Sequence, residues 1–343
     1  MRLGNLAAGP GLRAVKKVFE KQAAAGAFGA GPDGAALEIP GDPAHCVIQA
    51  AGTDPDALGQ ACCRVYACGA VPAAAQITIF VPQEVDEAQL KTLTRRLAAR
   101  AESLSVAVNG VSAQVRAGLT NVLTTATVTA IGDKALIHRL TGPRPGQALI
   151  AAGYAGQAGV RFCFPFLPDD VRKRFRSGYL QRAYGQESDT STAAAALVCR
   201  QALGSRAAGI SAMHAAGEGG IFAALWELTE GKNIGFTADV HKIPVRQEAL
   251  EVAQAAGLNL YAVNAQGCLL IAADDADSLV HAIREKGVPA AQLGTFTDNR
   301  DKILNNRGKV RFLDKPQEDL SVDFRYRLKG AEHGTQRTDP QRY

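Results

Sequence analysis

Strand-like and helix-like segments alternate along the first half of this 343-residue chain. The strand-like segments are rich in β-branched and small apolar residues, whereas the helix-like ones repeat apolar residues every three to four positions. The strands fall at 46–52, 76–82, 105–111 and 120–132, and the helices at 56–70 and from about Asp86 onward. This order predicts an α/β layer domain that ends near Gly132.

Proline and glycine punctuate the sequence around Gly142, which predicts a linker and the start of a second domain. We therefore predict domains at 1–142 and 143–323, followed by a polar tail at 324–343. Further predicted elements are a helix at 12–22, a Gly-rich loop at 26–41, a strand at 147–153, a less regular stretch at 161–190, a helix at 192–204, a loop at 211–220, a helix at 221–230, a strand at 235–240, a helix at 243–257 opened by Pro244, a hairpin-like strand pair at 261–273, a helix at 276–287, and strands at 293–298 and 309–314.

Charge and hydropathy narrow the classes of partner. The net charge is +5, and Lys and Arg alternate with Asp and Glu along most of the chain. With no basic stripe interleaved with aromatics and no amphipathic anchor, we expect neither nucleic acid nor membrane as a partner. The start of the chain lacks the charged and apolar pattern of a secretory signal, so we expect a cytoplasmic protein.

Seven cysteines lie mostly among small apolar residues. Their odd number and their setting predict buried, reduced thiols rather than a disulfide framework. Cys62, Cys63 and Cys68 cluster in sequence, but a structural metal site needs a fourth ligand at a matching spacing. None follows nearby, so we do not predict a cysteine metal site.

The most specific segments of the sequence are MHAAGEGGIFAALWELTE at 213–230 and the segment 243–273. Other characteristic segments are MRLGNL at 1–6, GPDGAAL at 31–37, GAVP at 69–72 and TATVTAIG at 125–132. In this order they resemble the family of aminoimidazole ribonucleotide synthetases and hydrogenase maturation factors, and the segment 243–273 is similar to hydrogenase maturation factors. Together they cover nearly all of the chain to about residue 320.

This resemblance implies a two-domain PurM-like architecture of the α/β (α+β) class. In the family, two N-terminal domains pair their sheets at a homodimer interface, and ATP lies with magnesium in a cleft near it. The terminal phosphoryl group is transferred to an amide-type oxygen. We accordingly expect the strands at 76–82 and 125–132 at a homodimer interface, and ATP and magnesium as candidate cofactors.

Most of the family's acidic site residues are missing here. In the first Gly-rich loop, Gly31, Asp33 and Gly34 remain, and Asp33 is the one surviving acid of that loop. The resemblance makes Asp33 a candidate magnesium ligand, although an Asp-Gly pair also simply makes a turn. Arg64 falls where the family has an Asp; it could contact a phosphate directly, or it could be an ordinary surface arginine.

The remaining positions repeat this pattern of loss. Gly110 is retained in 109–113, where the family has a His and an acid, and Val111 takes the place of that His. In the segment from 213 onward, Ala215 replaces an Asp. The residues that remain there are His214, Glu218, Gly219 and Gly220. Gly219 and Gly220 could present N–H groups to an anion or form an ordinary loop-to-helix junction, and His214 could be purely structural.

These losses favour a nucleotide-binding or degenerate scaffold with little turnover. The alternative is an active ATP-dependent enzyme that phosphorylates an amide or carbonyl oxygen of a small substrate. Hydrogenase maturation factors carry their reactive group on a C-terminal cysteine, whereas this chain ends in Tyr343. That cysteine chemistry therefore does not transfer, and the sequence does not define a substrate.

Overall fold

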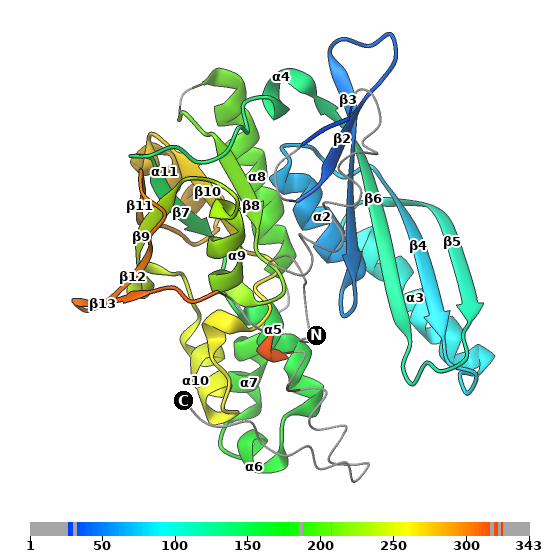
Figure 1. The fold of residues 1–343 in the computed structure, drawn as a ribbon. Helices are drawn as coiled ribbons and strands as arrows, with labels where there is room; N and C mark the ends of the chain where they lie inside the picture. Colours follow the sequence, from blue (N-terminus) through cyan, green and yellow to red (C-terminus); the bar gives the residue numbers. More distant parts are fainter. Residues whose placement is uncertain are drawn as a thin grey trace.

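The chain folds into two α/β halves, each built on its own sheet (Figure 1). The computed structural model describes residues 27–29, 33–184, 188–206, 208–315, 319–321 and 324. The helix predicted at 12–22 lies outside these residues, as does the predicted tail after residue 324. The mixed α/β class predicted from the alternating pattern is confirmed.

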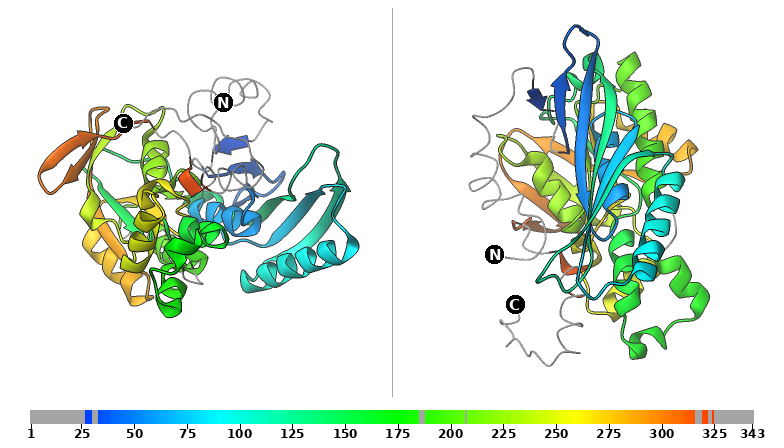
Figure 2. Two further views of the ribbon diagram at one scale, coloured as in Figure 1. Left: turned by 90° about the horizontal axis from the view of Figure 1, so that it is seen from below. Right: turned by 90° about the vertical axis from the view of Figure 1, so that its right-hand side faces the viewer.

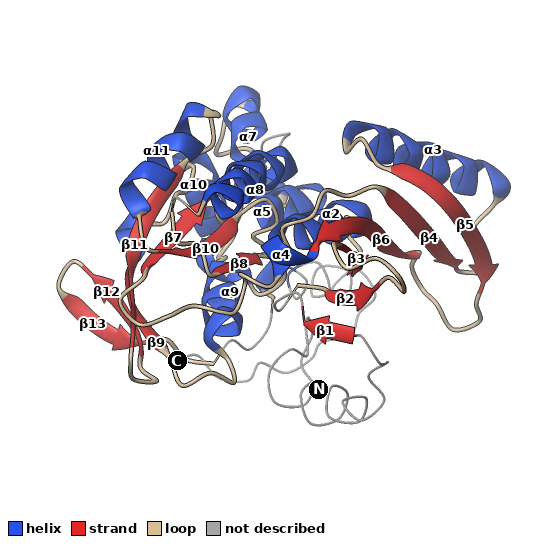
Figure 3. Cartoon of the chain, turned by 90° about the horizontal axis from the view of Figure 1, so that it is seen from above, coloured by secondary structure: helices blue, strands red, loops and turns tan. Residues whose placement is uncertain are grey.

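The first half is a six-stranded sheet with two long helices on one face (Figure 3). The strand order is β1-β2-β3-β6-β4-β5, and β4 and β5 are its parallel pair. The elements are β1 Ala27–Gly29, β2 Ala35–Glu38, β3 His45–Thr53, α2 Ala57–Ala67, β4 Ala74–Val81, α3 Glu87–Ser103, β5 Ala107–Val115 and β6 Leu123–Asp133. The predicted succession of strands and helices is confirmed.

Two details of this half differ from or sharpen the prediction. The Gly-rich segment 26–41 was expected to be a loop, yet it holds β1 and β2. Its small residues carry no strand signal of their own, and β2 forms because β3 offers it an antiparallel partner. The start predicted near Asp86 is confirmed by a capping box, in which the Asp86 side chain accepts from the Gln89 N–H and the Gln89 side chain accepts from the Asp86 N–H.

The second half is a seven-stranded sheet covered on both faces. Its order is β13-β12-β9-β11-β7-β10-β8. The strands are β7 Ala148–Ala152, β8 Ala212–Ala215, β9 Gly235–Asp239, β10 Leu269–Ala273, β11 Ala290–Thr297, β12 Lys302–Asn306 and β13 Lys309–Phe312. Helices α8 Ser188–Ser205 and α11 Ala276–Glu285 pack on one face, and α9 Gly220–Thr229 packs on the other. Every residue of β7, β8 and β10 is buried, as expected of strands covered on both sides. The short α4 Lys134–Ile137 follows β6 in the segment that leads to this half.

A separate group of helices extends from one end of this half (Figure 2). It consists of α5 Gln157–Cys163, η3 Phe164–Phe166, α6 Asp169–Arg172, α7 Ser177–Tyr184 and α10 Gln247–Ala255, which share one hydrophobic cluster. The stretch 161–190, predicted as irregular, is therefore mostly helical. Pro165 and Pro168 help to divide it into pieces too short to show a helical period.

Three other predictions for this half are wrong. The loop predicted at 211–220 contains β8, a short buried strand that its neighbour β10 pairs. The strand pair predicted at 261–273 is the 3-10 turn η5 Leu260–Ala262 followed by the single strand β10. Pro244 lies ahead of α10 rather than in its first turn, because Arg246 is the N-cap. Another 3-10 turn, η4 Val240–Lys242, precedes that proline.

Helix α2 belongs to the cores of both halves. Leu58 and Val65 pack in the cluster of the first sheet, whereas Cys63 and Ala67 pack in the cluster that contains β7, β8 and β10. The side chain of Arg200 on α8 also donates to the carbonyl of Gly69, just after α2, at 3.1 Å. The two halves thus meet along a buried helix.

All seven cysteines are free and buried, which confirms the prediction of unpaired thiols in apolar settings. Burial raises the pKa of Cys62 and of Cys63 to about 12. Across the described residues, no group of three or more His, Cys, Asp or Glu side chains is placed to hold a metal ion. Among the same residues, no helix has the length and apolar character that crossing a bilayer requires.

Candidate functional site

A buried histidine joins the two halves through two carboxylates. His214, in β8, lies with its Nδ1 2.9 Å from Asp33 Oδ2, and Asp33 immediately precedes the strand β2 region of the first half. Its other ring nitrogen, Nε2, lies 3.1 Å from Oε2 of Glu227 on α9. Asp33 is 8% exposed and His214 is 3% exposed. One residue of the first half and two of the second therefore form one ionic cluster, which we call the Asp33–His214–Glu227 cluster.

The two carboxylates keep this histidine charged. Burial alone would lower the pKa of His214, but the charges and hydrogen bonds of Asp33 and Glu227 raise it to about 10. At neutral pH the ring is then an imidazolium that donates from both nitrogens. It has no free lone pair with which to accept a proton, so it is not placed to act as a general base.

The carboxylate of Asp33 is occupied by hydrogen bonds from the protein itself. Besides His214, it accepts from the backbone N–H of Ala215, with both carboxylate oxygens at 3.3 Å. Ala215 is the position where the family has an acid, and here its backbone N–H contacts Asp33. Gly34 is required for this approach, because a Cβ there would lie 2.9 Å from both Cys68 Sγ and Gln49 O. Gly31, predicted with these residues, lies outside the described residues.

The backbone N–H of Gly219, the N-cap of α9, already binds an anion from the same chain. The Gly219 N–H donates to Oδ2 of Asp319 at 2.6 Å, and the Gly220 N–H donates to the carbonyl of Gly217 at 3.1 Å. Asp319 is 1% exposed. Both glycines have positive φ, and a Cβ on Gly220 would lie 2.3 Å from the carbonyl oxygen of Tyr261, so the turn admits only glycine there.

Arg64 and Glu218 lie beside these groups. Arg64 donates from Nη1 to the carbonyl of Ala51 at 2.7 Å. Burial and the carboxylate of Asp319 raise the pKa of Glu218, while the positive charge of Arg64 opposes that shift. The structure thus brings Asp33, His214, Glu218, Gly219 and Gly220 together with Arg64 at the junction of the halves. Gly110 is different: it lies on the outermost strand β5, and three strands separate β5 from β2.

A second polar cluster at this junction was not anticipated from sequence. Asp56, the N-cap of α2, accepts from Arg100 through both carboxylate oxygens at 3.1 and 2.7 Å. Gln266, from the second half, donates to the same Asp56 carboxylate at 2.9 Å. Burial alone would raise the pKa of Asp56, but Arg100 holds it below its usual value. Burial lowers the pKa of nearby Arg161, which the charge of Asp56 partly offsets.

Some of these residues gave no signal that sequence reasoning could use. Asp319 lies 100 residues after the glycine that it contacts, and Asp56 and Gln266 are 210 residues apart. Asp56 could have been recognised as an N-cap, since it begins a helical segment. Its contact with the second half depends on how the two sheets pack.

The residues present do not fit a magnesium ion of the kind that the family resemblance implies. Magnesium prefers oxygen ligands in octahedral geometry and usually needs one or two available carboxylates. Asp33 is committed to a histidine and a backbone N–H, and Arg64 places positive charge near the other acid, Glu218.

Comparison with known proteins gives a consistent relationship. Residues 167–305 match the family model of the AIR synthase related protein C-terminal domain. A protein of Methanocaldococcus jannaschii described as a hydrogenase expression/formation protein is 22% identical over 253 residues, which are 72% of this chain and 71% of that protein.

Solved structures share the fold at low sequence identity. A structure of the hydrogenase maturation protein HypE in complex with ATP has a TM-score of 0.63 at 15% identity, covering 83% of this chain and 88% of that one. HypE from E. coli has a TM-score of 0.62 at 18% identity, covering 89% and 98%. PurL from T. maritima, complexed with ATP, has a TM-score of 0.61 at 14% identity, covering 83% of this chain and 47% of PurL.

Proposed function

We propose that this chain is a degenerate, scaffold-type member of the PurM-like superfamily of AIR synthase-related proteins and hydrogenase maturation factors, with little or no phosphoryl transfer. Any nucleotide binds at the junction of the two halves, through Arg64 and neighbouring backbone groups, without a magnesium ion. We do not assign the substrates of the active relatives to this protein.

The observation that carries this proposal is the internal neutralisation of the junction. Phosphoryl transfer depends on positioned positive charge and a metal at the phosphates. Here the Asp33 carboxylate pairs with His214, and the helix N-terminus at Gly219 is filled by Asp319. The groups that could have held a metal or a phosphate are satisfied by the protein itself.

Calorimetric titration of the full chain with ATP tests this proposal. We expect an affinity that magnesium does not increase, and ATP hydrolysis at the background rate. Arg64→Gln should weaken nucleotide binding about tenfold or more, because a guanidinium that contacts a phosphate contributes a charge-assisted pair. Arg95→Gln, an exposed arginine on α3, removes the same charge elsewhere and should leave the affinity unchanged.

The alternative is an active ATP-dependent enzyme that phosphorylates an amide or carbonyl oxygen. It is supported by the structural neighbours, since HypE and PurL have both been solved in complex with ATP. Under this alternative, wild-type protein would hydrolyse ATP in a magnesium-dependent way, and Glu218→Gln would abolish that turnover. Arg64→Asp combined with Ala215→Asp would strengthen magnesium binding only if both positions face the nucleotide.

We also propose that the protein is a homodimer formed through the first sheet. The face opposite α2 and α3 carries Leu37, Val47 and Ile131 in one row across β2, β3 and β6. Leu37 is 44% and Ile131 is 55% exposed, and exposed apolar side chains on a sheet face indicate a surface that a partner covers. The open face includes the outward side chains of β4 and β6, the strands that the family resemblance predicts at the interface.

Light scattering at micromolar concentration is expected to give the mass of a dimer. Ile131→Lys should shift it toward monomer, because a lysine placed at a buried interface must be desolvated without a partner. Val310→Lys makes the same kind of change on β13, where Val310 is 65% exposed, and should leave the dimer intact. A wild-type monomer would contradict the proposal.

We place the protein in the cytoplasm, without a nucleic-acid or membrane partner. Seven free buried thiols support this assignment, since unpaired cysteines of this number suit a reducing compartment.

A further inference from the structure

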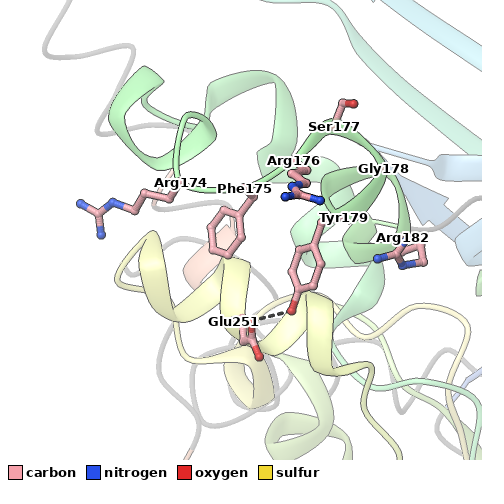
Figure 4. Close-up of a pocket in the computed structure, with 8 residues that line it drawn as sticks. All are labelled: Arg174, Phe175, Arg176, Ser177, Gly178, Tyr179, Arg182 and Glu251. Atoms are coloured by element: carbon pink, nitrogen blue, oxygen red, sulfur yellow. Dashed lines mark hydrogen bonds between the residues drawn. The ribbon is translucent and has the colours of Figure 1, made fainter.

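A surface hollow lies on the helical group, apart from the junction of the two halves. Its volume is about 770 Å³, within the range of small-molecule sites. Figure 4 shows the residues that line it, which come from the turn before α7, from α7 itself and from α10: Arg174, Phe175, Arg176, Ser177, Gly178, Tyr179, Arg182 and Glu251. None of them belongs to the Asp33–His214–Glu227 cluster.

Positive charge is in excess around this hollow. Contrary to the expectation of no basic segment interleaved with aromatics, residues 172–182 form such a segment. The carbonyl of Arg176 accepts from the N–H groups of Tyr179 and Leu180, but its guanidinium makes no hydrogen bond or ion pair with another residue that the structure describes. Arg182 pairs with Glu248 at 2.9 Å and Arg174 with Asp170 at 3.2 Å, but the arginines of both pairs are more than half exposed. Exposed pairs of this kind contribute little, so both guanidinium groups can turn to a ligand.

The acid in the hollow is already engaged. Glu251 accepts from the hydroxyl of Tyr179 and from the side-chain amide of Gln247 at 2.8 Å. The hydrogen bond from Tyr179 lowers the pKa of Glu251, and Glu251 in turn raises the pKa of Tyr179 to about 12. One wall of the hollow is therefore a neutral phenol hydrogen-bonded to a carboxylate. The guanidinium groups are the charges that remain available to a ligand.

Two stacked rings form the apolar part of the site. The rings of Phe175 and Tyr179 are nearly parallel, 6° apart in plane, with centroids 5.5 Å apart. The guanidinium of Arg182 lies 5.6 Å from the centre of the Tyr179 ring. In Figure 4 Arg176 lies beside the two rings, while Arg174 extends away from them at the rim. Cationic groups and flat apolar surfaces thus occur side by side.

We propose that this hollow binds a small organic phosphate that carries a planar ring. Arg176 and Arg182 would hold the phosphate, because the planar guanidinium donates two parallel hydrogen bonds to phosphate oxygens. The Phe175–Tyr179 pair would contact the ring, because aromatic faces favour stacked or edge-on aromatic partners. The volume of the hollow, about 770 Å³, fits a small ligand rather than an extended strand.

Isothermal titration calorimetry on the full chain, with phenyl phosphate as the probe, tests the site. We expect phenyl phosphate to bind more tightly than inorganic phosphate, and phenol not to bind. Arg176→Gln should weaken phenyl phosphate binding about tenfold, the scale of one charge-assisted hydrogen-bonded pair. Arg95→Gln, which removes one exposed positive charge on α3, should leave the affinity unchanged.

Three results would overturn the proposal. Equal affinities of wild type and Arg176→Gln would show that the arginine does not touch the ligand. An equal loss in Arg95→Gln would mean that net charge alone attracts the phosphate. Equal binding of inorganic phosphate and phenyl phosphate would remove the role of the two rings. Circular dichroism should be used to check that each variant is folded. Arg182→Gln provides a second test of the phosphate contact.

Discussion

Replacing His214 by glutamine is expected to lower the free energy of unfolding by about 3 to 5 kcal/mol at pH 7. The substitution removes the positive charge between Asp33 and Glu227 and leaves Asp33 buried without its counter-ion. Glutamine keeps a polar side chain of similar reach, so the loss reports the charge rather than a cavity. Urea denaturation followed by circular dichroism measures the difference.

The same cluster predicts a dependence on pH. The pKa of His214 is about 10 in the folded protein, above the unperturbed value of about 6.5 expected after unfolding. The stabilisation is therefore complete below about pH 6.5 and is lost as the pH rises toward 10. Between pH 7 and pH 8.5, the unfolding free energy of wild type should fall by about 2 kcal/mol. The buried thiols begin to contribute above that range, because their folded pKa values are raised as well.

Two variants make this test specific. His281→Gln removes a histidine that is 77% exposed and pairs with Glu285 in its own helix, and it should change the stability by less than about 1 kcal/mol. Combining His214→Gln with Asp33→Asn and Glu227→Gln removes all three charges and should recover much of the loss. A His214→Gln protein with wild-type stability and an unchanged pH profile would show that the cluster is not ionised.

Replacing Asp319 by alanine is expected to increase the affinity of the junction for ATP about tenfold. Asp319 places a carboxylate against the Gly219 N–H at the start of α9, and a helix N-terminus attracts anions. Removing the carboxylate frees that N–H and lowers the negative charge near Glu218. The titration is best carried out in the Arg176→Gln background, so that the hollow on α7 does not add to the signal.

An exposed carboxylate gives the matched control for Asp319→Ala. Asp298→Ala changes the net charge by the same amount and should leave ATP binding unchanged. If Asp298→Ala raises the affinity equally, general electrostatics explains the effect. If Asp319→Ala weakens ATP binding, the carboxylate helps to shape the site rather than to fill it.

The elements predicted correctly are those whose periodicity and caps lie within their own residues. Helix α3 and the alternating strands β3 and β6 carry their period and caps within their own residues, and each was assigned correctly. Strands β1, β2 and β8 are short and depend on neighbours for their pairing, and each was assigned to a loop. The family resemblance supplied the two-domain fold, which local periodicity alone would not have given.

The candidate site was likewise predicted only in part: its residues were found, but its long-range contacts were not. The resemblance selected His214, Glu218 and Gly219, and the structure brings them together with Asp33 and Arg64. It did not reveal that Asp33 pairs with His214 or that Asp319 fills the turn at Gly219, since both contacts join residues at least 100 positions apart. Contacts at that range arise from how the two sheets pack.

Helix α2, which is shared by both cores, constrains how this chain can evolve. Its Leu58 side completes one interior and its Cys63 side completes the other. The two halves are consequently not exchangeable modules, because neither can be recombined with a foreign counterpart unless the outward side of this helix is rebuilt. Substitutions accepted in one half are constrained by residues in the other, and the halves must diverge together.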